Sequence, residues 1–298
     1  MPRRPAVVEV EGLHKSYGDT QAVRGIDLTV TEGEVLAMLG PNGAGKTTTV
    51  EILEGYRTRD SGRVSILGMD PSDAGPELRR RVGIVLQSCG FEAYLTVAEM
   101  LRMHAGYYPH PRPVDEVLAL VGLEEKAGSR VRTISGGQQR RLDMGLALVG
   151  DPELLFLDEP TTGFDPTARR QAWSVIRDLC ALGKTVLLTT HYMDEAQALA
   201  DRIVVVRDGT VVAEGSPDEL GGRASGAVTI RFAVDPAAEL TPDIEIAERD
   251  GDVVLVRTTD PVRVLHALTS WSLDTGTEIR SLSVTPPTLE DVYLELTR

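Results

Sequence analysis

The sequence predicts an α/β layer fold over its first two thirds and a small α+β domain after it. From residue 7 to about residue 220, short β-rich runs alternate with helical patterns, which is typical of a sheet covered by helices. Several β-rich runs are almost continuously apolar, as expected for strands with both faces covered. Residues 221–226 are rich in glycine and are the best linker candidate. We therefore expect one domain over residues 6–220 and an accessory domain over residues 227–298.

The individual elements follow from the same patterns. Strands of the first domain are expected at residues 7–10, 26–30, 35–39, 64–67, 82–86, 154–157, 186–189 and 203–206. Its helices are expected at residues 47–53, 97–107, 114–121, 135–149, 166–182 and 193–199. In the accessory domain, strands are expected at 228–234, 244–247, 253–257 and 279–284, with helices at 262–271 and 288–296.

Charge and hydropathy argue against several classes of protein. The chain has 31 Lys and Arg against 45 Asp and Glu, a formal net charge of −14. Because nucleic-acid affinity comes mainly from basic side chains that neutralise phosphates, no nucleic-acid partner is expected. The longest stretch without a charged residue, from Val35 to Gly45, is far shorter than the roughly 20 apolar residues of a membrane-spanning helix. The first residues also lack the apolar core of a signal peptide, so a cytoplasmic protein is expected.

A phosphate-binding loop is predicted between the strand at 35–39 and the helix at 47–53. Residues 40–47 match G-x-x-x-x-G-K-T, in which glycines allow successive backbone N–H groups to point at phosphates. Lys46 is expected to reach the β- and γ-phosphates of a nucleotide, and the Thr47 hydroxyl is expected to bind Mg²⁺. The alternative is a glycine-rich turn that contains a lysine by chance. Such a turn would not require a strand before it and a helix after it, and the sequence predicts both. The expected nucleotide-binding residues of this loop are Gly40, Pro41, Asn42, Gly43, Ala44, Gly45, Lys46, Thr47 and Thr48.

A second apolar strand ends in two adjacent carboxylates, Asp158 and Glu159. Ligands bind at the carboxyl ends of strands in open α/β sheets, so both side chains are expected beside the phosphates. We expect Asp158 to hold Mg²⁺ and Glu159 to act as the general base for an attacking water. Adjacent acids repel each other unless a cation lies between them, which is a further reason to expect the metal. A solvated acidic turn is the alternative for the pair taken alone.

Residues 134–138, with the sequence ISGGQ, lie between the phosphate loop and the carboxylates in the chain. In this order, the three elements resemble the nucleotide-binding domain of ABC ATPases, a group of P-loop NTPases, over about residues 6 to 220. The resemblance implies ATP and Mg²⁺ as ligands, ATP hydrolysis, and a helical subdomain at about residues 88–150. It also implies a homodimer, in which the signature residues of one chain close over ATP held by the other. The signature residues are Ser135, Gly136, Gly137 and Gln138.

The resemblance implies roles for four further residues. His191, after the strand at 186–189, would contact the γ-phosphate. Gln87 would touch both the metal site and the loop that meets a membrane partner, which makes it a candidate ligand of nucleotide and metal. Tyr17 falls where the family places an aromatic ring that stacks on adenine. Asp165 caps the helix that begins at Pro166 and lies in a loop that would cross the dimer interface. Taken alone, His191 would be a structural residue, Gln87 a surface residue and Tyr17 a half-buried packing residue.

Two small departures and one terminal segment refine the resemblance. Ile134 replaces the more usual Leu or Tyr before the signature, and Phe164 replaces the usual Leu before Asp165, but neither change removes a catalytic group. Residues 286–297 resemble the closing helix of ATPases from drug-resistance-type (daunorubicin/doxorubicin-resistance-like) bacterial exporters. In those systems the permease is a separate membrane protein. Read alone, the segment is simply a capped amphipathic helix.

Three functions fit these motifs. The first is the ATPase subunit of an ABC exporter of a drug or other hydrophobic compound, held at the inner face of the cell membrane by a separately encoded integral membrane permease. The second is the ATPase subunit of an ABC importer. Importers and exporters share the nucleotide motifs, and only the C-terminal segment of this chain favours export. The third, a soluble ABC ATPase acting on the ribosome or DNA, usually carries two nucleotide domains or a long coiled coil. The sequence shows neither of these, and its acidic charge suits nucleic acid poorly.

Overall fold

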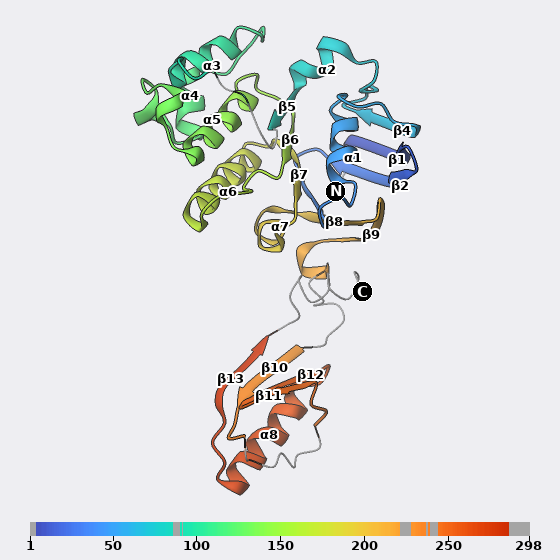
Figure 1. Ribbon diagram of the computed structural model, residues 1–298, viewed down its shortest axis with the longest axis vertical. Helices are drawn as coiled ribbons and strands as arrows, with labels where there is room; N and C mark the ends of the chain where they lie inside the picture. The colour runs from blue at the N-terminus through green and yellow to red at the C-terminus, as the bar shows by residue number, and fades with distance from the viewer. Residues whose placement is uncertain are drawn as a thin grey trace. The chain divides into compact units, whose positions relative to one another are not determined.

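The computed structural model describes residues 4–85, 90, 92–220, 228–236, 238 and 244–285. Contacts within the chain divide it into two compact units, Met1–Glu214 and Gly215–Arg298 (Figure 1). The linker expected at residues 221–226 and the closing helix expected at 288–296 lie outside the described residues. Gln87 and Cys89 lie outside them as well.

A six-stranded sheet forms the centre of the first unit, in the order β5-β6-β7-β3-β8-β9. The strands are β3 (Val35–Leu39), β5 (Val82–Val85), β6 (Leu154–Asp158), β7 (Thr185–Thr190), β8 (Arg202–Arg207) and β9 (Thr210–Gly215). The pairs from β5 to β8 are parallel. Since Leu39 pairs with Thr190 and Asp158 with Thr189, the strands β3, β6 and β7 end at one edge of the sheet. Each residue of these three strands is buried, which explains why β3 and most of β6 are apolar. The buried polar residues at the strand ends are Asp158, Thr185, Thr189 and Thr190.

A second, antiparallel sheet packs against the first. It has the order β2-β1-β4, formed by β1 (Ala6–Tyr17), β2 (Thr20–Thr31) and β4 (Ser61–Ile66). Helix α1 (Lys46–Leu53) contributes Val50, Ile52 and Leu53 to the core between them. In this core Leu13 and Ile26 of the second sheet join Phe156 of the first. The phosphate loop is therefore built on a well-packed base.

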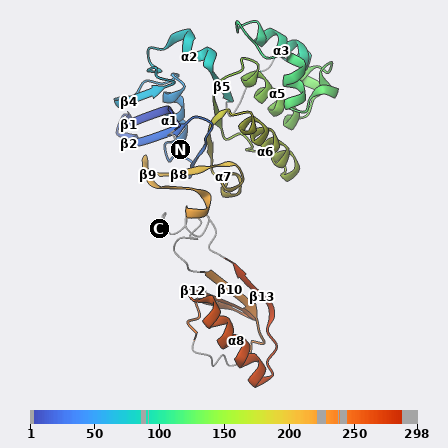
Figure 2. The ribbon, with the colours of Figure 1, turned by 180° about the vertical axis from the view of Figure 1, so that it is seen from behind.

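The remaining helices of the first unit lie around the central sheet. They are α2 (Gly75–Arg81), α3 (Val97–Ala105), α4 (Val114–Leu120), α5 (Gly136–Leu148), α6 (Pro166–Ala181) and α7 (Met193–Leu199), with short 3₁₀ turns at Glu124–Lys126 and Val131–Thr133. Helices α3, α4 and α5 pack on one another, on the side of the central sheet away from β1, β2 and β4 (Figures 1 and 2). Thr96 and Glu99 form a capping box that starts α3, and Asp165 caps α6 directly before Pro166.

In its described residues, the second unit is a four-stranded antiparallel sheet with one helix. The strand order is β11-β12-β10-β13, with β10 (Val228–Ala233), β11 (Glu248–Asp250), β12 (Val253–Thr258) and β13 (Arg280–Thr285). Helix α8 (Pro261–Thr275) places Leu268 and Trp271 against Ile230, Phe232 and Val256 of the sheet. This core is separate from that of the first unit.

Several expected elements differ from the structure. The strand expected at residues 244–247 is wrong, because the strand that pairs with β12 is Glu248–Asp250. The turn at Gly251, with φ 58°, brings Asp250 opposite Val253, so pairing starts beside the turn rather than at the apolar residues farther back. Helix α2 and strand β9 were not expected, since both are short and only partly buried. The helix expected to reach residue 107 ends at Ala105.

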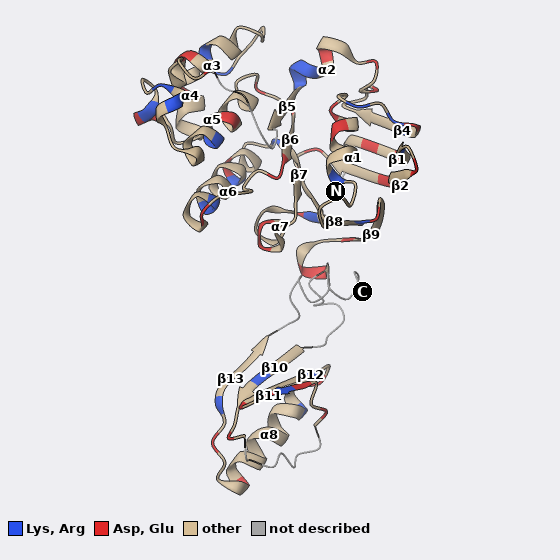
Figure 3. Cartoon of the chain, viewed as in Figure 1, with Lys and Arg blue, Asp and Glu red and all other residues tan. Residues whose placement is uncertain are grey.

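Charges of both signs are spread over the first unit (Figure 3). Arg79, Arg80 and Arg81 give the end of α2 a basic group, while β1 and β2 carry acidic residues. None of the helices in the described part of the chain has the length and apolarity that crossing a bilayer requires.

Candidate active site

The phosphate loop joins β3 to α1 through glycines that no other residue could replace without strain. A Cβ atom on Gly40 would lie 2.3 Å from the carbonyl oxygen of Val206, and one on Gly45 would lie 2.4 Å from that of Ala22. Gly45 also has φ 102°, in the left-handed region, where it forms the N-cap of α1. Lys46 Nζ donates hydrogen bonds to the carbonyl oxygens of Gly40 (2.7 Å) and Pro41 (3.1 Å). The loop is thus curled around its lysine, with the N-terminus of α1 available to a phosphate.

Asp158 ends β6 as a buried carboxylate. The Thr189 hydroxyl on the neighbouring strand donates to Asp158 Oδ1 at 2.5 Å. Burial raises the pKa of Asp158; the hydrogen bond from Thr189 opposes this shift, and repulsion from Glu159 adds to it. An acid in this position favours a nearby cation, because a cation would restore its charged form.

Glu159 follows Asp158 in a left-handed backbone conformation, with φ 45°. Its N–H donates to the backbone oxygen (3.2 Å) and the hydroxyl (3.0 Å) of Thr189, and its Oε2 accepts from the Thr162 hydroxyl at 3.0 Å. Its Oε1 lies 4.0 Å from Lys46 Nζ and 3.2 Å from His191 Nδ1. The structure therefore brings Lys46, Glu159 and His191 together at one point.

Lys46 and His191 both have polar atoms that suit a bound ligand. Burial lowers the pKa of Lys46, and the charges of Glu159 and Asp158 oppose that shift. His191 Nδ1 is buried and makes no well-aligned hydrogen bond to any described residue, despite its approach to Glu159. A polyanion with several oxygens would give His191 Nδ1 a partner and would offer Lys46 Nζ a further acceptor.

A pocket of about 390 Å³ opens beside these groups, and we call it the phosphate-loop pocket. Tyr17, at the end of β1, contributes a 41% exposed ring to its wall, with the Arg57 guanidinium 5.2 Å from the ring centroid. An exposed ring of this kind offers a flat face for stacking. The lining residues are Tyr17, Ala22, Asn42, Gly43, Gly45, Lys46, Thr47, Thr48 and Glu159.

The signature residues lie in a different pocket of about 750 Å³, the signature pocket. Ser135 caps α5 in a capping box: its hydroxyl accepts from Gln138 N (3.3 Å), and its N–H donates to Gln138 Oε1 (2.9 Å). The N–H groups of Gly136 and Gly137 belong to the first turn of α5, which has no intrahelical acceptor. Asp165 lines the same pocket and accepts from Thr167 N and Ala168 N, and these hydrogen bonds lower its pKa.

The donor set beside the phosphate loop fits Mg²⁺. Thr47 offers a hydroxyl and Asp158 a carboxylate, and Mg²⁺ is usually held by one or two carboxylates together with substrate phosphates. The described residues contain no cluster of three His, Cys, Asp or Glu side chains that could hold a metal without a substrate. Gln87, the third expected metal ligand, lies outside the described residues. In sites that hydrolyse nucleotides, Mg²⁺ is held by protein oxygens together with the phosphates of the substrate.

Three residues at this site were not predicted from the sequence. Thr189 bonds to both carboxylate-bearing residues, and Thr162 bonds to the Glu159 carboxylate. The register of parallel strands could have suggested Thr189, because the next-to-last residue of β7 lies level with Asp158, the acid that ends β6. Arg140 of α5 donates hydrogen bonds to the backbone oxygens of Asp158 and Pro160 in the same turn. No sequence motif predicts this contact.

Comparison with known proteins fits this geometry. Residues 23–162 match the model of the ABC transporter family, and residues 228–288 match that of an ABC transporter domain-containing protein-like C-terminal domain. The Nod factor export ATP-binding protein I of Cupriavidus pinatubonensis is 38% identical and covers 100% of this chain and 92% of its own length. The chain belongs to the ABC transporter ATP-binding proteins. This confirms the predicted family and its ATPase activity.

Other relatives and solved structures agree. The daunorubicin resistance ATP-binding protein DrrA3 of Streptomyces coeruleorubidus is 38% identical, with 97% of this chain and 95% of that protein covered. The structure of cbiO1 from Clostridium perfringens, part of an ABC transporter complex, has a TM-score of 0.66 at 31% identity and covers 74% of this ABC protein and 92% of that chain. A dimeric, post-hydrolysis ATP-binding cassette bound to ADP and Pi has a TM-score of 0.63 at 27% identity, covering 70% of this chain and 98% of its own. The predicted α/β nucleotide-binding fold is therefore confirmed.

Proposed function

We propose that two copies of this ABC ATPase bind ATP between them, with the phosphate-loop pocket of each facing the signature pocket of the other. The observation that carries this proposal is the separation of the two pockets within one chain. Lys46 and Glu159 line the first, whereas Ser135 and Gly136 line the second. The lone chain offers the ATP only half of its contacts. A second copy would supply the free N–H groups at the start of α5 to the γ-phosphate.

Within that shared site, each group has a role that its position supports. Lys46 would neutralise the β- and γ-phosphates, and Tyr17 would stack on the adenine. Glu159, aimed by Thr162 and by the backbone bonds to Thr189, would take the proton of a water that attacks the γ-phosphorus in line. His191 would hold a γ-phosphate oxygen. Mg²⁺, held by Thr47 and Asp158 with Gln87 as a further candidate, would offset the phosphate charge.

We also propose that hydrolysis powers export through a separate integral membrane permease at the inner face of the cell membrane. The proposal is supported by the names of two relatives, a Nod factor export ATP-binding protein and a daunorubicin resistance ATP-binding protein. The similarity to each extends over almost the full length of both chains. A drug or another hydrophobic compound is the substrate class that the second of these names favours. No nucleic acid is involved in this proposal.

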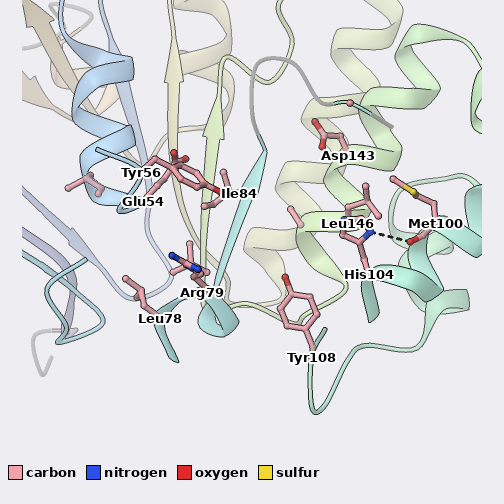
Figure 4. Close-up of a pocket in the computed structure, with 14 residues that line it drawn as sticks. Glu54, Tyr56, Leu78, Arg79, Ile84, Met100, His104, Tyr108, Asp143 and Leu146 are labelled. Carbon is pink, nitrogen blue, oxygen red and sulfur yellow. Dashed lines mark hydrogen bonds between the residues drawn. The ribbon is translucent and has the colours of Figure 1, made fainter. Parts of the chain in front are cut away.

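The pocket in Figure 4 is the proposed place for the permease to contact this subunit. Glu54 and Tyr56 lie on one side of it and His104 and Tyr108 on the other. Gly90 also lines the pocket, three residues beyond Gln87, which the family resemblance links to the membrane partner. Glu54 Oε1 is buried without a hydrogen-bond partner among the described residues, so a donor on the permease would satisfy it.

The shared site is tested by assembly. Glu159→Gln keeps the shape of the side chain but removes the base, so ATP should bind and remain intact. This variant should then run as a dimer by light scattering with saturating ATP and Mg²⁺, and as a monomer without nucleotide. Glu153→Gln, a change at a carboxylate that pairs with Arg81 outside the pockets, is the matched control and should hydrolyse ATP like the wild type. A Glu159→Gln chain that stays monomeric with ATP bound would contradict the shared site.

A further inference from the structure

Arg140 joins the signature helix to the catalytic turn of the same chain. It lies on the second turn of α5, close to the Ser135 cap. Its Nε donates to the backbone oxygen of Pro160 at 3.1 Å, and its Nη2 donates to the backbone oxygens of Asp158 (3.1 Å) and Glu159 (3.4 Å). One guanidinium therefore holds three consecutive carbonyl groups of the turn that carries the catalytic carboxylates.

The guanidinium is itself held from the other side. Arg140 Nη1 donates to Asp143 Oδ2 at 2.9 Å, one helical turn farther along α5. The two side chains are only 12% and 5% exposed. A planar guanidinium with several fixed donors is well suited to hold such a set of acceptors in one geometry, which a flexible ammonium cannot reproduce.

The turn that Arg140 holds needs support. Glu159 has φ 45°, a conformation that non-glycine residues rarely adopt and that persists only where neighbouring groups enforce it. The Glu159 carboxylate approaches Lys46 and His191 only while this turn keeps its shape. Loss of the arginine would free three carbonyls at once and let the carboxylate move.

We infer that Arg140 is a positioning residue: it aligns Glu159 for attack and transmits the position of the signature helix to it. The inference rests on the proposed shared site. When the start of α5 binds ATP on the partner chain, α5 is fixed in place, and Arg140 fixes the catalytic turn of its own chain. Occupancy of one ATP site thus prepares the carboxylate of the other, which makes hydrolysis cooperative.

The test compares two neighbouring arginines of α5 in the full-length chain. Arg140→Gln is compared with Arg141→Gln, because Arg141 also donates to two carbonyls, those of Val121 and Gly122, but away from the catalytic turn. ATP hydrolysis is measured against ATP concentration, and binding of a fluorescent ATP analogue is measured separately. We expect Arg140→Gln to lower kcat about 10- to 100-fold, because small misplacements of a catalytic group have effects of this size. The nucleotide Kd should be unchanged and the Hill coefficient should fall towards one.

Arg140→Lys keeps the charge and can reproduce one or two of the hydrogen bonds of the arginine, and it serves as a second variant in case the glutamine variant misfolds. It should recover part of kcat but not the cooperativity, since an ammonium cannot hold all three carbonyls. The inference is overturned if Arg140→Gln lowers kcat no more than Arg141→Gln, or if folded Arg140→Lys has wild-type kcat and Hill coefficient. Failure of the shared site itself is distinguishable, because wild-type hydrolysis would then show no cooperativity and Glu159→Gln would not dimerise.

Discussion

The phosphate-loop pocket and the signature pocket hold different kinds of group. The first has an almost fully buried charge in its wall, Lys46, and another beside it, Asp158, and these residues are only 4% and 7% exposed. The second presents the starts of two helices, whose capping side chains Ser135 and Asp165 are already hydrogen-bonded within the chain. Of the expected reacting groups, Lys46 and Glu159 line only the first pocket, and the second contains the backbone N–H groups at the start of α5. The difference supports the proposal that pockets of two chains together form one ATP site.

The largest expected effect follows from removing the base in the phosphate-loop pocket. Glu159→Gln should lower kcat for ATP hydrolysis by roughly 10²- to 10⁴-fold, the usual contribution of a general base. ATP affinity should hardly change, because Lys46 and the loop glycines remain. Steady-state phosphate release and equilibrium nucleotide binding measure the two quantities. A wild-type rate in this variant would remove Glu159 from the chemistry.

A change in the signature pocket should affect the pair of chains and leave the single chain intact. A Cβ on Gly136 would meet nothing within 4 Å, so Gly136→Glu is accommodated, and an acid at a helix N-terminus stabilises the helix. The same carboxylate would repel the γ-phosphate of a partner's ATP. We expect hydrolysis and ATP-dependent dimerisation to be lost while nucleotide binding and thermal stability persist. Calorimetric ATP binding to the variant provides the check, and loss of binding would place Gly136 at its own chain's nucleotide.

Thr189→Val is expected to have a smaller effect in the phosphate-loop pocket. The hydroxyl bonds to Asp158 Oδ1 and to Glu159 N, and the residue is fully buried. Removing it at constant shape should cost about 1–3 kcal/mol of unfolding free energy, the range for buried hydrogen bonds to charged groups. The rate of hydrolysis should fall as well, because Asp158 loses a support. Urea unfolding and ATPase assays measure both effects. Thr185→Val, at the opposite end of β7, is the control for a threonine lost from the same strand.

The last predicted effect is on stability alone, with no change in hydrolysis expected, and it lies outside both pockets, at Glu54. Burial, aided by the charges of Asp158 and Glu51, raises the pKa of Glu54 to about 8 from 4.5. The folded chain therefore keeps a proton between these pH values that the unfolded chain releases, so stability falls as pH rises through this window. Glu54→Gln has no such proton and should be more stable than the wild type by about 1–3 kcal/mol at pH 9, but not at pH 4. If the wild type and Glu54→Gln were equally stable at pH 9, the Glu54 carboxyl group would be solvated and its pKa would not be raised.

Sequence patterns predicted the backbone of the site better than its side-chain contacts. The carboxylates were expected beside the phosphate loop because ligands bind at the carboxyl ends of strands in open α/β sheets, and His191 was expected there from the resemblance to ABC ATPases. The structure has the loop, the carboxylates and His191 at one sheet edge. The contacts of Thr162, Thr189 and Arg140 depend on strand register and on the rotation of α5, which short motifs do not encode. The strand expected at residues 244–247 failed for a related reason, since the turn at Gly251 sets the pairing. The expected roles of the site residues remain predictions, and Gln87 lies outside the described residues.

The central claim, that each ATP lies between two chains, is tested most directly by mixing two inactive variants. Lys46→Ala disables the phosphate-loop pocket, and Gly136→Glu disables the signature pocket. A mixed dimer would contain one site built from the intact pocket of each chain. At equal amounts we predict recovery of up to about a quarter of wild-type hydrolysis, since half of randomly paired dimers are mixed and each has one intact site. A mixture no more active than either variant alone would contradict the shared site.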